Sequence, residues 1–240
     1  MKKKAVLVVG AGGLGVPAIV ALGACGEFAL GLVDPERVEL SNLARQIIYG
    51  SRQLGAFKVE AAARYLRERL EYRDVEPMSI ALDASNAAAL VALYDFVIDA
   101  TDDPAVKFLI NDVCLAAQRP FCYGGVLGFR GQAMTVLGRK TACLRCLFEF
   151  PPEAGETASC RDAGIIGSVA GLIGFVQAKE AIAYLRGGKP RLAGKLFAYD
   201  ATGQASVRIL AVRPREDCAP AGARLGLGHT GVGAPAGAIR

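Results

Sequence analysis

Short runs of β-branched and aliphatic residues alternate with longer stretches of mixed polarity along the first half of the chain. The first run, "AVLVV", is suited to a buried parallel strand. The pattern predicts strands at residues 5–9, 28–33, 74–81, 95–99 and 120–124. Between them it predicts helices at residues 13–24, 55–70, 86–93 and 104–117. Such alternation is typical of a parallel sheet with helices on both faces.

The pattern changes after Gly124, and the second half is expected to be partly antiparallel. It predicts a strand in "GQAMTVLG", a "CLRC" turn, a Pro/Gly-rich loop near 150–164, a helix at about 166–186, and strands near 195–199 and 205–212. From Pro214 onward the chain is rich in Gly, Ala and Pro, which predicts a flexible tail over 214–240. The predicted fold is therefore a single α/β domain over 1–213. Its sheet is expected to be Rossmann-like, doubly wound and mainly parallel, with antiparallel strands added in the C-terminal half.

Composition narrows the class of protein. At 240 residues and 52% hydrophobic, the chain suits one large domain. Its net charge of +5 comes without a stripe of aromatic and arginine side chains, so we expect an acidic protein partner and no nucleic acid. The uncharged part of the apolar stretch near 166–186 is shorter than the roughly 20 residues that span a bilayer, so we expect no membrane segment. Seven cysteines without regular spacing indicate reduced thiols and a cytoplasmic protein.

The N-terminal segment "MKKKAVLVVGAGGLGVPAIVALGAC" can be interpreted in two ways. Three lysines, an apolar run and Cys25 resemble an export signal with a lipid-attachment cysteine. The glycines argue against a signal helix, because each would cost it roughly 1 kcal/mol of stability. Gly10, Gly12 and Gly15 instead have the G-x-G-x-x-G spacing of a strand, a turn and a helix, which lets backbone N–H groups approach phosphate oxygens.

Charged residues downstream of the glycines suggest which nucleotide binds. Asp34 ends the second predicted strand, where such folds place an acid against ribose hydroxyls, and this feature also suits an NAD-linked oxidoreductase. Asn42 and Arg45 follow that strand, Lys58 starts the next helix, and Asp102 follows the fourth strand. Ligands of doubly wound sheets bind at the carboxyl ends of the strands, so these side chains should converge on the glycine turn. Two cations and a carboxylate there fit a triphosphate with a magnesium ion better than a dinucleotide.

As an ordered set, these motifs resemble those of the ubiquitin-activating enzyme superfamily in its bacterial MoeB/ThiF/HesA form. The resemblance runs from about Val6 to Val212 through "GAGGLG", "SNLARQ", "GAFK", "DATDD", "CLRC" and "AGIIGSVAGLIGFVQAKEAI". It implies an ATP- and magnesium-dependent adenylyltransferase, acting on the C-terminal glycine of a small ubiquitin-like sulfur-carrier protein and releasing pyrophosphate. The implied pathway is that of thiamine, molybdopterin or a related sulfur transfer. It also implies a homodimer that pairs through the second half of the sheet.

The resemblance further implies a role for each matching residue. The implied ATP ligands are Gly10, Gly12, Gly13 and Gly15 at the phosphates, Asp34 at the ribose, Asn42, Arg45 and Lys58 at the triphosphate, and Asp102 at the magnesium ion. Arg45 and Lys58 have a simpler interpretation as solvated surface cations. Asp102 could instead serve only to cap the helix near 104, although Asp103 is the stronger candidate for that cap.

The cysteines divide by context. Cys143 and Cys146 resemble half of the family's structural zinc site, but of the second pair only Cys218 is present, because Ala221 occupies the position three residues later. A tetrahedral zinc ion would need a fourth ligand, such as His229, another cysteine or a residue of a partner. Without the metal, the first two cysteines would form a relic turn or a redox-active pair.

Cys160 matches the cysteine of the family's mobile crossover loop, which in some members bonds covalently to the sulfur carrier. Arg161 beside it would favour the thiolate. Other members adenylate without such a thiol, so a covalent role stays open. Cys25, Cys114 and Cys122 are expected to be small core residues.

Two departures from the family keep other interpretations open. Relatives usually begin with a helical segment that lends an arginine to the neighbouring subunit's active site, whereas this sequence begins at the first predicted strand. Glu36 stands where relatives often have a second Asp. A nucleotide-binding scaffold without turnover and an NAD-linked oxidoreductase are therefore the alternatives to the adenylyltransferase.

Overall fold

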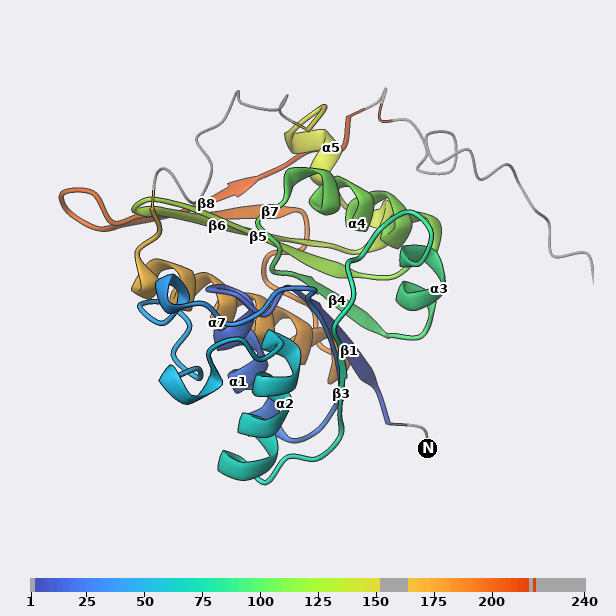
Figure 1. The fold of residues 1–240 in the computed structure, drawn as a ribbon. Helices are drawn as coiled ribbons and strands as arrows, with labels where there is room; N and C mark the ends of the chain where they lie inside the picture. Colours follow the sequence, from blue (N-terminus) through green and yellow to red (C-terminus); the bar gives the residue numbers. More distant parts are fainter. Residues whose placement is uncertain (1–2, 152–163, 216–217, 219–240) are drawn as a thin grey trace, which may run out of the picture.

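The computed structural model describes residues 3–151, 164–215 and 218 and contains one eight-stranded sheet (Figure 1). The strands lie in the order β3-β2-β1-β4-β5-β6-β7-β8. Their bounds are Ala5–Val9 (β1), Ala29–Val33 (β2), Val75–Met78 (β3), Phe96–Asp99 (β4), Phe121–Leu127 (β5), Arg130–Val136 (β6), Lys195–Asp200 (β7) and Ser206–Ala211 (β8). The pairs among β1 to β5 are parallel, and β5 to β8 pair antiparallel. This confirms the predicted Rossmann-like, mainly parallel sheet with an antiparallel extension.

Helices cover both faces of the sheet. Their bounds are Gly15–Cys25 (α1), Lys58–Arg69 (α2), Ala87–Ala92 (α3), Pro104–Ala116 (α4), Leu144–Leu147 (α5) and Gly167–Leu185 (α7). Figure 1 shows α1, α2 and α7 on one face, with α3, α4 and α5 on the other. Successive side chains of a strand point to opposite faces, so each face has its own core. Along β1, Val6 and Val8 pack in the first core, while Leu7 and Val9 pack in the second.

Helix α7 is a core helix, as its apolar pattern predicts. Gly174 allows it to approach the start of α1 closely, because a Cβ at this position would lie 2.2 Å from Leu14 O. The buried Glu180 ties α7 to β6 and to the segment before β7, since its Oε2 accepts hydrogen bonds from Thr135 Oγ1 and Leu192 N, both at 2.8 Å. Within the described part of the chain, no helix is long and apolar enough to cross a membrane.

Element boundaries differ from the predictions where turn geometry decides them. The first helix starts at Gly15, because the residues before it form the glycine turn. The third strand covers only Val75–Met78 at the edge of the sheet, where Pro77 supplies no N–H for a ladder. The predicted "CLRC" turn is the short helix α5. Short helical turns that the pattern did not predict are Leu40–Asn42 (η1), Ser51–Gln53 (η2) and Gly138–Lys140 (η3). The predicted loop near 150–164 and the predicted tail lie mostly outside the described residues.

Candidate active site

The glycine turn between β1 and α1 packs against the end of β4. Gly10 has a φ of +97°, and a Cβ on it would lie 2.6 Å from Ala100 O. A Cβ on Gly15 would lie 1.8 Å from Gly10 O. Both positions therefore require glycine. A Cβ on Gly13, by contrast, would meet only side chains, among them Arg45 Cδ at 3.7 Å.

The N-terminus of α1 is open to an anion. Its N-cap residue, Leu14, makes no side-chain capping hydrogen bond, and the first turn of this helix contains no acidic residue. In the first turn of α1, Val16 N already donates to Gly12 O at 2.9 Å and Pro17 has no N–H, so the helix offers an anion chiefly the positive end of its dipole and the backbone amides before Val16. Behind a turn of glycines, such a terminus is suited to phosphate oxygens.

Asp34 fixes the shape of the turn from the end of β2. Its Oδ2 accepts a hydrogen bond from Ala11 N at 2.7 Å, and its Oδ1 accepts one from Glu36 N at 2.8 Å. The side chain is buried. Burial raises the pKa of Asp34, while the two backbone N–H groups and the charge of Lys58 partly offset the increase. Each oxygen keeps a lone pair that can accept a further hydrogen bond.

Asn42 and Arg45 lie on the segment that passes over the turn. Asn42 is buried, and its Oδ1 accepts from Glu39 N at 3.2 Å. Arg45 Nη1 donates to Ser41 O at 2.9 Å, and its stem lies beside Gly13. The aliphatic part of the Arg45 side chain therefore lies beside the glycine turn at Gly13.

Lys58 is joined to the same turn through Tyr49. Only 3% of Lys58 is exposed, and its Nζ forms an ion pair with the Glu36 carboxylate at 2.5 Å. Tyr49 is also buried, and its hydroxyl shares its one hydrogen between Ala11 O at 2.9 Å and Lys58 O at 3.1 Å. Tyr49 thus connects the glycine turn to the first residue of α2.

Two residues beside the turn were not predicted from the sequence. Gln46 is buried with Nε2 3.6 Å from the position of a Cβ on Gly12, and its Oε1 has no hydrogen-bond partner among the described residues. Tyr49 is the second. Gln46 could have been predicted as a site residue, because it is the last residue of the "SNLARQ" motif. Nothing in the sequence pattern distinguishes Tyr49 from a tyrosine of the core.

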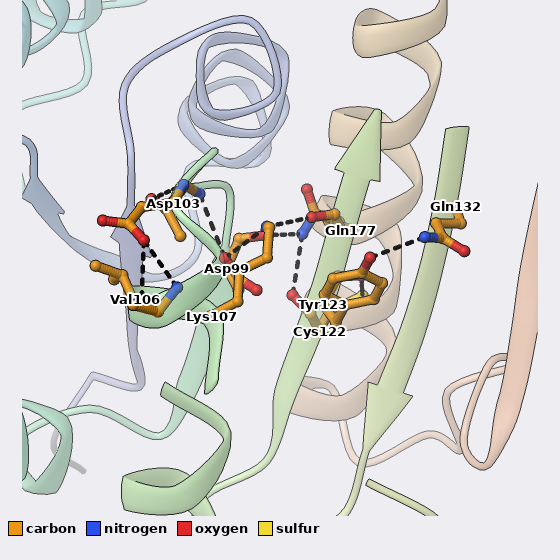
Figure 2. Close-up of polar contacts among 11 residues, drawn as sticks. Asp99, Asp103, Val106, Lys107, Cys122, Tyr123, Gln132 and Gln177 are labelled. Atoms are coloured by element: carbon orange, nitrogen blue, oxygen red, sulfur yellow. Dashed lines mark hydrogen bonds and ion pairs between the residues drawn. The ribbon is translucent and has the colours of Figure 1, made fainter. Parts of the chain in front are cut away.

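The two aspartates after β4 have different surroundings. Asp103 caps α4, because its Oδ1 accepts from Ala105 N at 2.8 Å and Val106 N at 3.4 Å (Figure 2). This confirms Asp103 as the stronger capping candidate. Asp102 is exposed, and its carboxylate has no hydrogen-bond or ion-pair partner within residues 3–151, 164–215 and 218. The turn that carries it touches the glycine turn, since a Cβ on Gly10 would lie 3.0 Å from Thr101 N.

A buried ion pair lies next to this turn and was also missed by the sequence analysis. Asp99, the last residue of β4, is fully buried, and its Oδ1 pairs with Lys107 Nζ at 3.1 Å (Figure 2). Burial raises the pKa of Asp99, and the charge of Lys107 opposes that increase. The structure thus brings several predicted site residues together at the carboxyl ends of the parallel strands. They are the glycine turn, Asp34, Arg45, Lys58 and the turn that carries Asp102.

Three cysteine sulfurs form a second cluster, at the "CLRC" turn. Cys143 Sγ lies 3.8 Å from Cys146 Sγ and 3.6 Å from Cys218 Sγ, and all three sulfurs lie within 4.8 Å of one another. A tetrahedral zinc ion with bonds of about 2.3 Å holds its sulfur ligands about 3.8 Å apart, so this geometry fits three corners of a zinc site. Within the described residues, no further Cys, His, Asp or Glu joins the cluster. His229 lies outside those residues.

The cluster is anchored, with Cys143 buried and Cys146 and Cys218 partly buried. Arg145, between the first two cysteines, donates to both oxygens of Asp112 on α4, at 2.8 Å and 2.6 Å. Burial raises the pKa of Cys143, and it raises the pKa of Cys218 to about 12. A bound metal would favour the thiolates and reverse these shifts.

The other cysteines only partly match the prediction. Cys114 and Cys122 are core residues, as expected. Cys25 is only half-buried, because it is the last residue of α1. Cys160 lies outside the described residues.

Sequence comparisons with known proteins give one family and several named relatives. The sequence model of the ThiF family matches residues 1–220. The "Adenylyltransferase and sulfurtransferase MOCS3" of Anopheles gambiae is 38% identical over 216 residues, which cover 90% of this chain and 49% of that protein. The "Sulfur carrier protein adenylyltransferase" of Thermus thermophilus is 39% identical over 224 residues, or 91% of this chain and 82% of that protein. The chain therefore spans about half the length of the MOCS3 relatives that it matches.

Solved structures support the fold. Escherichia coli MccB in complex with ATP aligns with a TM-score of 0.77 at 18% identity, over 92% of this chain and 68% of that one. Another MccB complex aligns with a TM-score of 0.80 at 19% identity, over 91% of this chain and 67% of that one.

Proposed function

The chain belongs to the ThiF family, and from that premise we propose that it is an ATP- and magnesium-dependent adenylyltransferase. Its proposed substrate is the C-terminal glycine carboxylate of a small ubiquitin-like sulfur-carrier protein. One observation carries this proposal: an uncapped helix N-terminus behind a glycine turn has Arg45, Lys58 and the Asp102 turn around it. The names of the relatives favour the same reaction over an NAD-linked oxidoreductase.

The proposed role of each residue follows from its place. The phosphates would lie along Gly10–Gly15, with the positive end of the α1 dipole behind them. Asp34 would accept hydrogen bonds from the ribose hydroxyls. Arg45 and Lys58 would compensate the charge of the triphosphate from two sides, and Asn42 would contribute its buried amide.

The reaction joins two anions, so positioning and positive charge should supply most of the catalysis. An oxygen of the glycine carboxylate attacks the α-phosphorus, a new P–O bond forms, and the bond to the bridging oxygen breaks as pyrophosphate leaves. No general base is needed, because a C-terminal carboxylate is ionised at neutral pH.

Asp102 is the residue proposed to hold magnesium. Its exposed carboxylate, without a partner among the described residues, suits a hard cation that prefers oxygen ligands. A magnesium ion bound there would neutralise charge on the phosphate oxygens.

Zinc is proposed as a structural ion held by Cys143, Cys146 and Cys218. The sulfur distances given above support this assignment. Such a site would fasten the "CLRC" turn to the chain after β8, because its ligands come from both segments.

We propose that the protein is a cytoplasmic homodimer that binds an acidic carrier protein. The six described cysteines are all free thiols, which suits a reducing compartment. Large apolar side chains remain exposed on α7 and β8, which supports burial of this region between subunits.

Pyrophosphate exchange tests the proposed function. The protein should catalyse exchange between labelled pyrophosphate and ATP only when a cognate carrier and magnesium are present. Arg45→Ala should lower the exchange rate on the order of 100-fold. Arg52→Ala, an exposed arginine in η2, is the matched control and should retain the wild-type rate. Tight ATP binding without exchange for any carrier would instead indicate a scaffold.

A further inference from the structure

Lys107 stands behind the turn that carries Asp102, and it has no direct role in the ATP site described above. We propose that Lys107 is a positioning residue: it joins the end of β4 to the middle of β5 and thereby fixes the turn 100–103, so that the Asp102 carboxylate is held ready for the magnesium ion. This inference rests on the proposed function, and it concerns how the metal ligand is held.

One ammonium group ties two neighbouring strands together. Lys107 Nζ donates to Asp99 Oδ1 at 3.1 Å and to Gly124 O at 2.6 Å. Asp99 ends β4, and Gly124 lies in β5. Gln177 of α7 makes a similar link from the other face of the sheet, because its Nε2 donates to Asp99 O at 2.6 Å and to Cys122 O at 3.0 Å (Figure 2).

The turn itself is held through its backbone amides. Asp99 Oδ1 also accepts from Thr101 N at 3.3 Å, and Thr101 Oγ1 accepts from Asp103 N at 3.2 Å. Asp102 is thus flanked by two amides with side-chain acceptors, while its own carboxylate has no partner among the described residues. Fixing the neighbours of a ligand residue preorganises it for binding.

Lys107 also compensates a buried charge. The Asp99 side chain is fully buried, and its Oδ2 has no hydrogen-bond partner in the described part of the chain. A buried carboxylate that loses its cation becomes strongly unfavourable as an anion. Without Lys107 it would take up a proton or rotate, and its hydrogen bond to the Thr101 amide would weaken.

The test separates the contribution of the metal from the binding of ATP itself. The full-length protein is titrated with ATP in excess magnesium and, separately, in EDTA, and the ratio of the two affinities is the metal contribution. Lys107→Met should reduce this ratio about 10- to 100-fold while leaving the affinity in EDTA unchanged. Lys107→Arg should restore most of the ratio. Lys140→Met, at an exposed lysine, is the control and should behave as wild type.

A double-variant cycle connects the effect to Asp102. On an Asp102→Asn background, Lys107→Met should cause no further loss of the ratio, because both changes act through one carboxylate. If Lys107→Met does not fold, Thr101→Val removes the acceptor for the Asp103 amide and should lower the ratio in the same direction.

The outcomes distinguish the inference from the proposed function. A wild-type protein that binds ATP equally with and without magnesium would overturn both. A wild-type protein with a metal contribution that Lys107→Met retains would overturn the inference alone. The inference would also be overturned if Lys107→Met lost ATP affinity equally in magnesium and in EDTA and had a lower melting temperature, since these results indicate a purely structural lysine.

Discussion

Gly10 and Gly13 belong to one motif but serve different needs. Gly10 adopts a left-handed φ of +97° and leaves no room for a Cβ beside Ala100 O. Gly13 has only ordinary van der Waals distances to its neighbours. We therefore expect Gly10→Ala to lower the free energy of unfolding by about 1–3 kcal/mol, as measured by chemical denaturation. Gly13→Ala should leave it nearly unchanged.

Gly13→Ala should act on the ligand instead. Its methyl group would occupy the side of the turn that faces Arg45, where the phosphates are proposed to lie. Calorimetric titration should show weaker ATP binding by a folded protein. A Gly13→Ala protein that binds ATP as tightly as the wild type would contradict the proposed path of the phosphates.

Lys58 already has an anionic partner when no ATP is present. A triphosphate must compete with Glu36 for the ammonium group, and the Glu36 side chain is half exposed, so the pair is screened by solvent. Glu36→Gln should therefore strengthen ATP binding, by no more than about five-fold, and high salt should abolish the gain. Glu60→Gln, an exposed glutamate in the first turn of α2, is the control. Weaker binding in Glu36→Gln would mean that Glu36 itself contacts the nucleotide.

At the scale of elements, the junction between β4 and α4 separates two functions into adjacent residues. Asp103→Ala removes the helix cap and should cost about 1 kcal/mol of stability, with the metal contribution to ATP binding retained. Asp102→Ala should leave thermal unfolding unchanged, because its carboxylate has no partner in the described part of the chain, and should abolish the metal contribution. The reverse pattern would assign the magnesium site to Asp103.

The same junction shows what the sequence could and could not predict. Buried strands and the glycine turn were predictable, because hydrophobic runs and glycine spacing are local signals. The capping role of Asp103 was predictable for the same reason. The acceptor of Lys107 on β5 and the two carbonyls bound by Gln177 depend on which strands become neighbours. Periodicity along the chain contains no such information, so this network became visible only in three dimensions.

The "CLRC" turn provides a prediction about metal content. Atomic absorption should find about one zinc ion per chain, and removal by a chelator should lower the melting temperature. Cys218→Ser should lower the zinc content, whereas Cys25→Ser, at the half-buried end of α1, should not. A metal-free protein with an unchanged melting temperature would favour the relic turn or the redox pair.

At the scale of the whole molecule, large apolar side chains remain exposed along β8 and around a groove beside α7. β8 is exposed along its whole length and carries Val207, Ile209 and Leu210. On α7, Leu172 and Phe175 line a groove of about 610 Å³ together with Ile47. Soluble monomers rarely expose large contiguous apolar patches, which is why we propose a dimer.

Light scattering should give the mass of a dimer for the wild-type protein at micromolar concentration. Phe175→Asp should give the mass of a monomer, because it places a charge in the proposed interface. Leu93→Asp is the matched control, since Leu93 is even more exposed than Phe175 but follows α3 on the other face of the sheet. A monomeric wild type, or equal dissociation of both variants, would remove the prediction.

The position of this groove links assembly to catalysis. Arg45 lines the same groove as Phe175, so a subunit seated there would border the proposed ATP site. Pyrophosphate exchange per chain should then fall as the protein is diluted below the dissociation constant of the dimer, and it should be low in Phe175→Asp at every concentration. The ATP affinity of Leu93→Asp and its exchange rate should match the wild type. Constant activity per chain across dissociation would show that each subunit has a complete site, and the groove would then serve assembly alone.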